Sequence, residues 1–191
     1  MRKHYTLLAA TAICLSLNGC IAATLFTVAE AGKTFAQERS AGSRVDDNAT
    51  ALAINDKFVQ KDFGDMFANV DTQISEGRVL LAGSVDKPET RVEAERLVWE
   101  VSGVKEVINE IQVNNSANFA TYLEDAYISR HIKTQMFLTN GIKSVNYGVE
   151  TVNGEVYLMG IAVSQKELDI AIAIARRAPG VKKVVSHVIF K

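Results

Sequence analysis

The chain has 191 residues, of which 48% are hydrophobic, and its 21 Lys and Arg residues nearly balance 22 Asp and Glu residues, giving a formal net charge of −1. This composition is typical of globular proteins. Because the chain lacks the excess of basic charge that marks most nucleic-acid-binding proteins, we expect no nucleic-acid partner.

Residues 1–19 have the three parts of a secretory signal peptide. Arg2 and Lys3 form its positive end, residues 5–17 form its apolar core, and Gly19 is the small residue before the cleavage point. The core is shorter than the roughly 20 apolar residues that span a bilayer. We therefore predict that this segment directs export and is then removed.

The signal ends in Leu17-Asn18-Gly19-Cys20, which is similar to a bacterial lipobox, whose cysteine is acylated. Ile21 stands where an aspartate would retain a lipoprotein in the inner membrane of Gram-negative bacteria. By this resemblance, Cys20 is the lipidation site and the protein lies at the outer membrane, facing the periplasm. The alternative is an ordinary signal peptide with an incidental cysteine. Residues 20–45 mix small, polar and charged residues, and we predict a flexible tether spanning roughly 25–30 Å.

From residue 46 the sequence repeats itself at a constant offset of 77 residues. The matching segments are Gly77-Arg78-Val79-Leu80-Leu81-Ala82-Gly83 with Gly154-Glu155-Val156-Tyr157-Leu158-Met159-Gly160, and Gly103-Val104-Lys105 with Gly180-Val181-Lys182. One offset held over this distance indicates two copies of one module. We place the copies at residues 46–113 and 114–191.

Each copy is predicted to contain a helix, two strands, a second helix and a third strand. The first helices cover about residues 47–60 and 122–138. The first two strands form a hairpin that turns at Glu76-Gly77 or at Asn153-Gly154, where Asn-Gly in particular tolerates positive φ. The predicted fold is α+β, with two tandem α-β-β-α-β modules. In each module, two helices cover one face of a three-stranded sheet.

These residues resemble the BON domain, whose pattern has Asn-Gly-x-Val-x-Leu-x-Gly at the hairpin and Pro-Gly-Val before the last strand. The second copy fits closely, with Asp125 near its start and Pro179-Gly180-Val181 before its last strand. The first copy departs, since Glu76 replaces the Asn and Ser102 replaces the Pro. With its leader and tether, the whole chain is similar to the dual-BON outer-membrane lipoproteins. The resemblance implies binding of anionic phospholipid, support of outer-membrane integrity and cell division, and no catalysis.

The two copies differ in charge. Residues 46–113 hold 7 Lys and Arg against 14 Asp and Glu, a net charge of −7, whereas residues 114–191 hold 9 against 6, a net charge of +3. A basic module is attracted to an anionic membrane surface, and an acidic one is repelled. The alternative is that the charges of the two solvent-exposed surfaces have diverged by random drift, without a functional reason.

The first helix of the second copy has an unusual outward face. Every fourth residue is apolar at Ile128, Ile132 and Met136, which predicts the buried stripe. The helical period then turns a set of aromatic and basic residues outward, and these suit the interface and the headgroups of a bilayer. We predict as lipid-binding residues Tyr127, Arg130, Lys133, Thr134 and Phe137. The corresponding residues of the first copy carry no aromatic ring and no basic charge: Ala49, Leu52, Asp56 and Val59. The alternative is that Tyr127 and Phe137 pack against the other module.

The only tryptophan, Trp99, leans off the buried face of its predicted helix, and its counterpart in the second copy is Arg176. We predict that Trp99 fills the seam between the modules. The alternative is that it contacts a partner protein.

No enzyme site stands out in the sequence. An acylated Cys20 leaves no free thiol, and neither His131 nor His187 has neighbours that resemble a metal site or a catalytic triad. The glycines of the repeat lie in hairpins rather than in a phosphate-binding loop. We expect no catalysis, no cofactor and no metal ion.

Two other functions remain open. One is a protein-interaction adaptor that docks outer-membrane assembly proteins, such as the barrel assembly complex, through the acidic first copy or through Trp99. The other is recognition of a cell-wall polymer. The sequence leaves the lipid species, the protein partners and the oligomeric state undetermined.

Overall fold

The computed structural model describes residues 41–61, 69–114 and 119–191. The predicted signal peptide, Cys20 and residues 20–40 of the predicted tether lie outside this part of the chain. Residues 37–191 form one compact unit. None of the described helices is both long enough and apolar enough to cross a bilayer.

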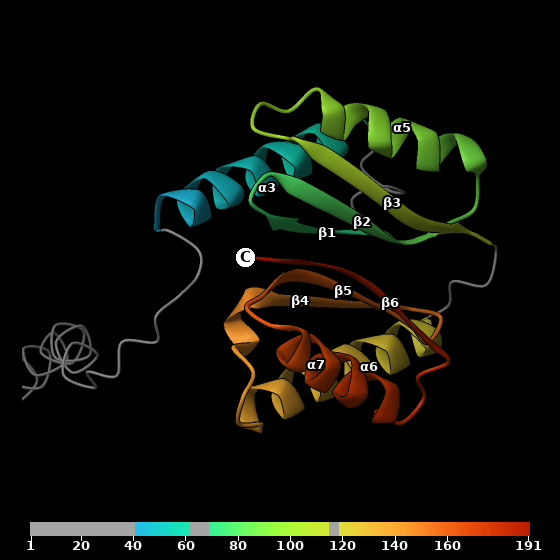
Figure 1. The fold of residues 1–191 in the computed structure, drawn as a ribbon. Coiled ribbons are helices and arrows are strands. Elements are labelled where there is room, and N and C mark those ends of the chain that lie inside the picture. The colour runs from blue at the N-terminus through green and yellow to red at the C-terminus, as the bar shows by residue number, and fades with distance from the viewer. Residues whose placement is uncertain (1–40, 62–68, 115–118) are drawn as a thin grey trace, which may run out of the picture. The chain divides into compact units, whose positions relative to one another are not determined.

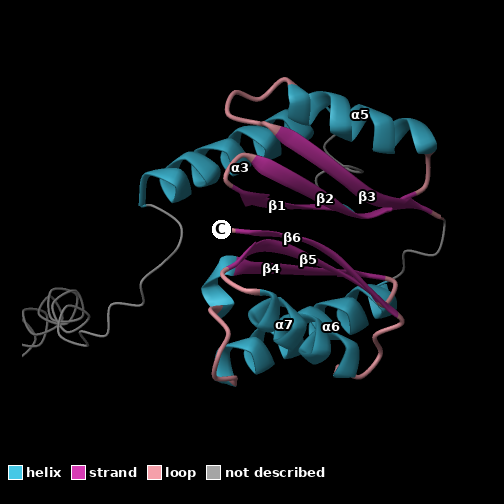
Figure 2. Ribbon diagram, viewed as in Figure 1, coloured by secondary structure: helices cyan, strands magenta, loops and turns pink. Residues whose placement is uncertain are grey.

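Each module has the predicted element order (Figures 1 and 2). The first module consists of α3 (Ala41–Lys61), β1 (Val70–Ser75), β2 (Arg78–Val85), α5 (Pro88–Trp99) and β3 (Glu106–Val113). The second consists of α6 (Phe119–Leu138), the short 3-10 helix η1 (Ser144–Asn146), β4 (Tyr147–Val152), β5 (Glu155–Ala162), α7 (Gln165–Arg177) and β6 (Lys183–Phe190). Because α3 begins at Ala41, residues 41–45, which we expected in the tether, are helical.

Both sheets have the same topology. The strand orders are β1-β2-β3 and β4-β5-β6, with an antiparallel first pair and a parallel second pair. The predicted turns are present, since Glu76 and Gly77 have φ of 57° and 81°, and Asn153 and Gly154 have φ of 53° and 80°. Each strand of the second module begins 77 residues after its counterpart, which confirms the repeat.

The second glycine of each hairpin motif, Gly83 or Gly160, lies where there is no room for a side chain. A Cβ on Gly83 would lie 2.0 Å from the carbonyl oxygen of Asn69, and a Cβ on Gly160 would lie 1.9 Å from that of Asn146. Both glycines also have positive φ. A side chain is excluded at these positions because the neighbouring backbone lies too close.

The helices of each module cover one face of its sheet (Figure 1). In the first module, Ile54 and Phe58 of α3 pack with Leu97 of α5 and with the inward residues of the sheet. In the second, the predicted stripe of Ile128, Ile132 and Met136 is buried against β4, β5 and α7. This confirms which side of α6 faces the core.

The central strands are apolar on both faces, which differs from our expectation of one apolar face per sheet. Val79 and Leu81 of β2 face the helices, whereas Leu80 and Ala82 belong to a separate buried cluster. That cluster also contains residues of the second module: Val152, Tyr157, Met159 and Val185. The two sheets therefore pack on each other, and each module buries the face that its own helices leave open.

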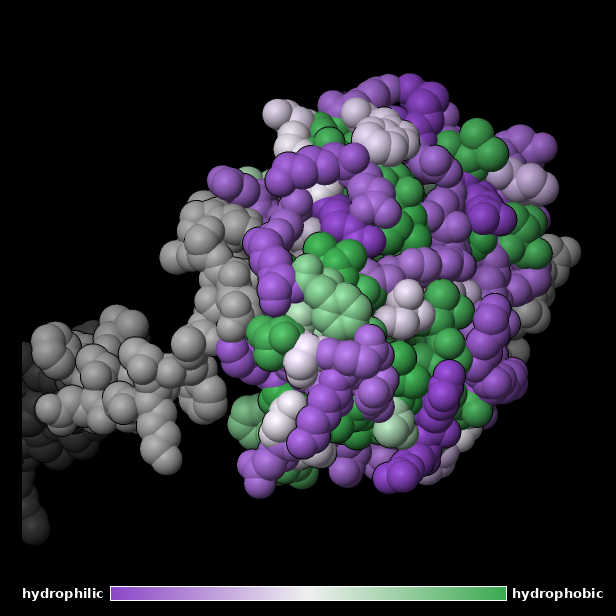
Figure 3. All heavy atoms as spheres, viewed as in Figure 1, coloured by the Kyte–Doolittle hydropathy of each residue, from purple (hydrophilic) through white to green (hydrophobic). Residues whose placement is uncertain are grey.

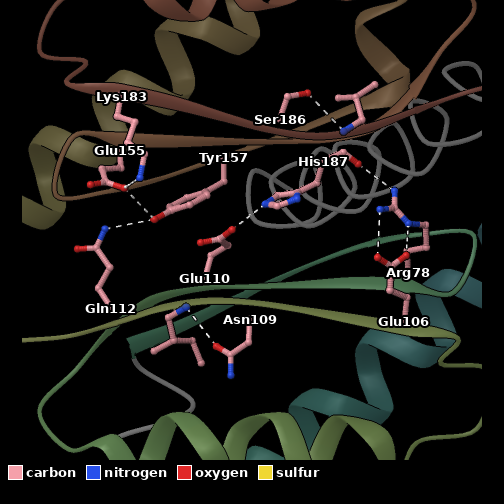
Figure 4. Close-up of polar contacts among 12 residues, drawn as sticks. Arg78, Glu106, Asn109, Glu110, Gln112, Glu155, Tyr157, Lys183, Ser186 and His187 are labelled. Atoms are coloured by element: carbon pink, nitrogen blue, oxygen red, sulfur yellow. Dashed lines mark hydrogen bonds and ion pairs between the residues drawn. The ribbon is translucent and has the colours of Figure 1, made fainter.

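Polar contacts cross this seam, as Figure 4 shows for several of them. His187 of β6 points toward Glu110 of β3, with 2.8 Å between Nε2 and Oε1, and Arg78 donates to the carbonyl oxygen of His187 at 2.9 Å. The Nε2 of Gln73 on β1 donates to Oε1 of Glu150 on β4 at 2.5 Å. Two of these contacts, Glu110 with His187 and Gln73 with Glu150, join residues that are 77 positions apart.

The prediction that Trp99 fills the seam is wrong. Helix α5 buries Ala94, Leu97 and Val98 against the sheet face opposite the seam, and Trp99 at its end remains 51% exposed. Trp99 lies off the buried side of α5, and this position faces solvent rather than the seam.

Candidate functional site

Helix α6 is fixed to its sheet by a carboxylate. Asp125 accepts hydrogen bonds from the backbone N–H groups of Asn153 and Gly154, at 2.6 and 2.8 Å. These N–H groups belong to the hairpin turn, where no strand partner reaches them, so the carboxylate meets their need for an acceptor. In the first module, Asp47 binds the turn at Glu76-Gly77 in the same way, at 2.9 and 3.0 Å. Sequence reasoning named Asp125 as a motif residue but missed this role.

All five predicted lipid-binding residues lie on the side of α6 that points away from its core. Tyr127 and Phe137 are 61% and 75% exposed, so the alternative that they pack against the first module is wrong. Four residues of the set line a shallow groove of about 480 Å³: Arg130, Lys133, Thr134 and Phe137, together with Ala126 and Ser129. Tyr127 lies outside the groove, and its ring centroid is 6.1 Å from that of His131. We call the five predicted residues the α6 face.

The apolar part of this surface is larger than the sequence predicted. Leu123 and Leu138, at opposite ends of α6, are both more than half exposed, and so is Tyr122. The spacing of Leu123 from Tyr127 is one helical turn, so extending the outward stripe by one step would have found it. The surface thus offers several large apolar side chains around one arginine and one lysine.

The corresponding face of α3 is chemically different. Leu52 and Asp56 are exposed there, in the positions that Arg130 and Thr134 occupy on α6. The nearby lysines of α3 are paired: Lys57 with Glu100 at 2.6 Å and Lys61 with Glu93 at 3.2 Å. Among the residues of α3 whose side chains the structure describes, this face therefore offers neither an exposed aromatic ring nor an unpaired basic group.

A second cavity adjoins the groove at the seam. It measures about 520 Å³ and shares Ala126 and Ser129 with the groove. Its lining includes two acids, Asp71 of β1 and Glu150 of β4. Burial raises the pKa of the Glu150 carboxyl, and the nearby Lys133 opposes this shift. The residue Asp71 is exposed as a whole, but desolvation at the cavity wall raises the pKa of its carboxyl as well.

Other sites are less distinct. Among the described residues, no group of three His, Cys, Asp or Glu side chains is placed to hold a metal ion. On the face that Figure 3 shows, hydrophobic residues form separate patches between hydrophilic ones. The α6 face is distinguished by its combination of exposed rings, basic charge and a groove.

Comparison with known proteins agrees with the repeat. The family model of the BON domain matches residues 46–115 and residues 124–191. The chain is 33% identical to the outer membrane lipoprotein DolP of Haemophilus influenzae, over 97% of this chain and 94% of that protein. It is 47% identical to an uncharacterized protein in the gshII 5′ region of Anaplasma centrale, over 77% of this chain and 96% of that protein. A 21 kDa hemolysin of Actinobacillus pleuropneumoniae is 29% identical, over 77% of this chain and 75% of that protein.

Proposed function

This chain belongs to the BON-domain family, and from that premise we propose that it is a non-enzymatic lipoprotein of the Gram-negative outer membrane whose second module binds anionic phospholipid. The protein faces the periplasm and supports the integrity of the envelope, with a role in cell division. The likeness to an outer membrane lipoprotein over almost the whole chain supports this location.

The observation that carries the proposal is the exposure of the α6 face. The exposed rings of Tyr127 and Phe137 are suited to the interfacial zone of a bilayer, and the exposed Arg130 is suited to binding a phosphate, which supports the proposal. A basic side chain near an anionic surface contributes about 1 kcal/mol. The net charge of +3 on residues 114–191 favours the same approach.

The anchor and the α6 face would act together. Acyl chains on Cys20 hold the protein at the membrane, and the tether keeps the second module within a few nanometres of it. Binding of the module then becomes an intramolecular step with a high effective concentration. A weak affinity for headgroups is enough under these conditions, and the protein would gather where anionic lipid is dense.

The test is flotation of a fragment of residues 21–191, which keeps the whole compact unit but lacks the acylated cysteine. The fragment should float with vesicles of phosphatidylcholine and phosphatidylglycerol, and not with phosphatidylcholine alone. Added salt should weaken the binding because it screens exposed charges. The variant Tyr127→Ala/Arg130→Ala should bind at least about tenfold more weakly, since it loses one ring and one charge.

The control variant is Leu52→Ala, which removes an exposed apolar side chain at the position on α3 that corresponds to Arg130. It should bind like the unchanged fragment. Equal binding of the Tyr127→Ala/Arg130→Ala variant would contradict the lipid assignment of the α6 face. Failure of the unchanged fragment to float would leave Cys20 as the only membrane contact.

A second candidate function is that of a protein adaptor, and the exposure of Trp99 favours it. The ring lies on the acidic first module, on the same side of α5 as Val92, which is also exposed. Such a pair could anchor a partner from the outer-membrane assembly machinery. A photocrosslinker at residue 96, which is exposed on α5 one turn before Trp99, should then capture one dominant protein in cells. A diffuse set of products would speak against an adaptor.

A further inference from the structure

The two basic residues of the α6 face, Lys133 and Arg130, differ in their ion pairing. Its Nζ lies 3.6 Å from Oε1 of Glu150 on β4, whereas Arg130 forms no ion pair within the described residues. The lysine side chain is 47% exposed, but that of Glu150 is only 17% exposed. One of the two cations of the α6 face is therefore attached to a largely buried acid.

Glu150 is in turn held by the first module. The same oxygen that faces Lys133 accepts a hydrogen bond from Gln73 of β1 at 2.5 Å. Asp71, two residues earlier on β1, lines the cavity that Glu150 also lines. The first module thus places an amide and a carboxyl behind the lysine of the second module.

The acids of the cavity that adjoins Lys133 come from three elements. Asp71 belongs to β1, Glu150 to β4, and Asp125 to α6 itself, on the wall of the same cavity. Asp125 already accepts two backbone hydrogen bonds at the hairpin turn. Lys133 opposes the rise in the pKa of Glu150 and of Asp71, so these two are the acids that interact with it. The charge of Asp71 adds to burial in raising the pKa of Glu150.

We propose that Glu150, held in place by Gln73 of the first module, is a positioning residue that, together with the nearby carboxyl of Asp71, restrains Lys133 and limits how strongly the α6 face holds anionic lipid. This inference rests on the proposed function. A lipid phosphate must compete with Glu150 for the ammonium group of Lys133. The free energy gained from the contact between Lys133 and the phosphate is therefore partly offset by the loss of the contact between Lys133 and Glu150. The first module would in this way set the density of anionic lipid at which the second module stays bound.

The variant Glu150→Gln tests the restraint. The amide can still pair with Gln73, but it no longer holds Lys133 by charge. Binding to phosphatidylglycerol vesicles should become about two- to fivefold tighter, as expected from the loss of one partly exposed ion pair. The matched control is Glu155→Gln, which removes the same charge from the same module but releases Lys183, its partner at 3.1 Å. In a Lys133→Gln background, Glu150→Gln should have no effect.

The pH profile separates positioning from a structural role. Burial raises the pKa of Glu150 above the ordinary value of 4.5. As the pH falls through this raised pKa, the carboxyl takes up a proton, Lys133 is released, and binding of the unchanged fragment should rise. The Glu150→Gln variant should lose this rise. A merely structural Glu150 would change the unfolding transition without changing the pH profile.

The outcomes distinguish this inference from the proposed function. If the unchanged fragment does not bind anionic vesicles, the proposed function fails and the inference fails with it. If the fragment binds but Glu150→Gln behaves like Glu155→Gln, only the inference is overturned. Should Glu150→Gln not fold, Asp71→Asn takes its place, because that residue is exposed and its replacement leaves the Gln73–Glu150 bond intact. It should tighten binding by a smaller factor, and unchanged binding would contradict the restraint.

Discussion

The two modules share their backbone and differ at their outward faces. Every strand of the second module begins 77 residues after its counterpart, and the hairpin carboxylates Asp47 and Asp125 bind their turns in the same way. At the α6 face and its counterpart on α3, by contrast, no residue type is shared. Positions that the fold requires are the same in both copies, so positions that differ are where a separate function is to be sought.

The largest effect is expected from substitutions at the backbone positions that the two modules share. Replacing Gly83 or Gly160 by Ala puts a Cβ about 2 Å from a backbone carbonyl oxygen. Each substitution should lower the free energy of unfolding by about 3 kcal/mol or more, because backbone has to move. Urea denaturation measures the loss. The control Gly148→Ala meets only the end of the Gln73 side chain and should cost less. Tolerance of Ala at one of the two glycines would break the equivalence of the modules.

The hairpin carboxylates come next. Asp47→Ala and Asp125→Ala each remove two charge-assisted hydrogen bonds to backbone N–H groups. Each should cost about 2–3 kcal/mol of unfolding free energy. The Asn variants keep one acceptor oxygen and should recover part of the loss. A large loss at one position together with none at the other would show that only one module needs its carboxylate.

The ion pair at the start of the parallel strands sharpens the comparison, because its sign is reversed between the modules. Arg78 faces Glu106 in the first module, and Glu155 faces Lys183 at the corresponding places in the second. In urea denaturation, Arg78→Glu should cost about 1 kcal/mol by placing like charges opposite each other, and more because it also removes the hydrogen bond from Arg78 to the His187 carbonyl. Adding Glu106→Arg should recover only the part that is due to the like charges.

The same pair predicts a pH dependence. The hydrogen bond from Arg78 lowers the pKa of Glu106 below its ordinary value of 4.5. The stabilisation by this pair is therefore present at neutral pH and is lost as the pH falls through the lowered pKa. An NMR titration of Glu106 should show a lowered pKa in the unchanged protein. In the Arg78→Glu variant that pKa should return to 4.5 or above, and an unchanged value would contradict the pairing.

The smallest effect is expected at Trp99. Replacing it by Arg, the residue at the corresponding position of the second module, should change the unfolding free energy by no more than about 0.5 kcal/mol, because the ring is half exposed. Acrylamide should quench its fluorescence strongly in the folded protein. Weak quenching, or a large loss of stability, would place the ring in a buried contact.

Much of the fold could be predicted from the sequence because its signals are local. Asn153-Gly154 predicts the turn, and the spacing of Ile128, Ile132 and Met136 predicts the buried side of α6. The start of α3 was harder to predict, because residues 41–45 carry no strong helical pattern. They extend toward the N-terminus the helix that the later residues form. The α6 face followed from the same helical period that identified the core.

A seam between the modules was expected, but the residues that form it could not be predicted, because they come from two sheets that are distant in the sequence. Leu80 and Tyr157 read as ordinary strand residues, and only the packed structure shows that each lies on the second buried face of its sheet. The link from Gln73 through Glu150 to Lys133 was hidden for the same reason. Trp99 was predicted wrongly because its position off the buried side of α5 was taken to point toward the seam, whereas the seam lies on the opposite face of the sheet.

The contacts between residues 77 positions apart have a further consequence. Residues that meet their own counterparts lie at a local two-fold axis, as in an isologous dimer interface. In a dimer of identical single modules, such a position would place glutamate against glutamate or histidine against histidine. Joining two copies in one chain removes this constraint, so that Glu110 can face His187. The pair of Glu110 and His187 therefore favours a seam between one first module and one second module, and it disfavours a seam between two copies of the same module.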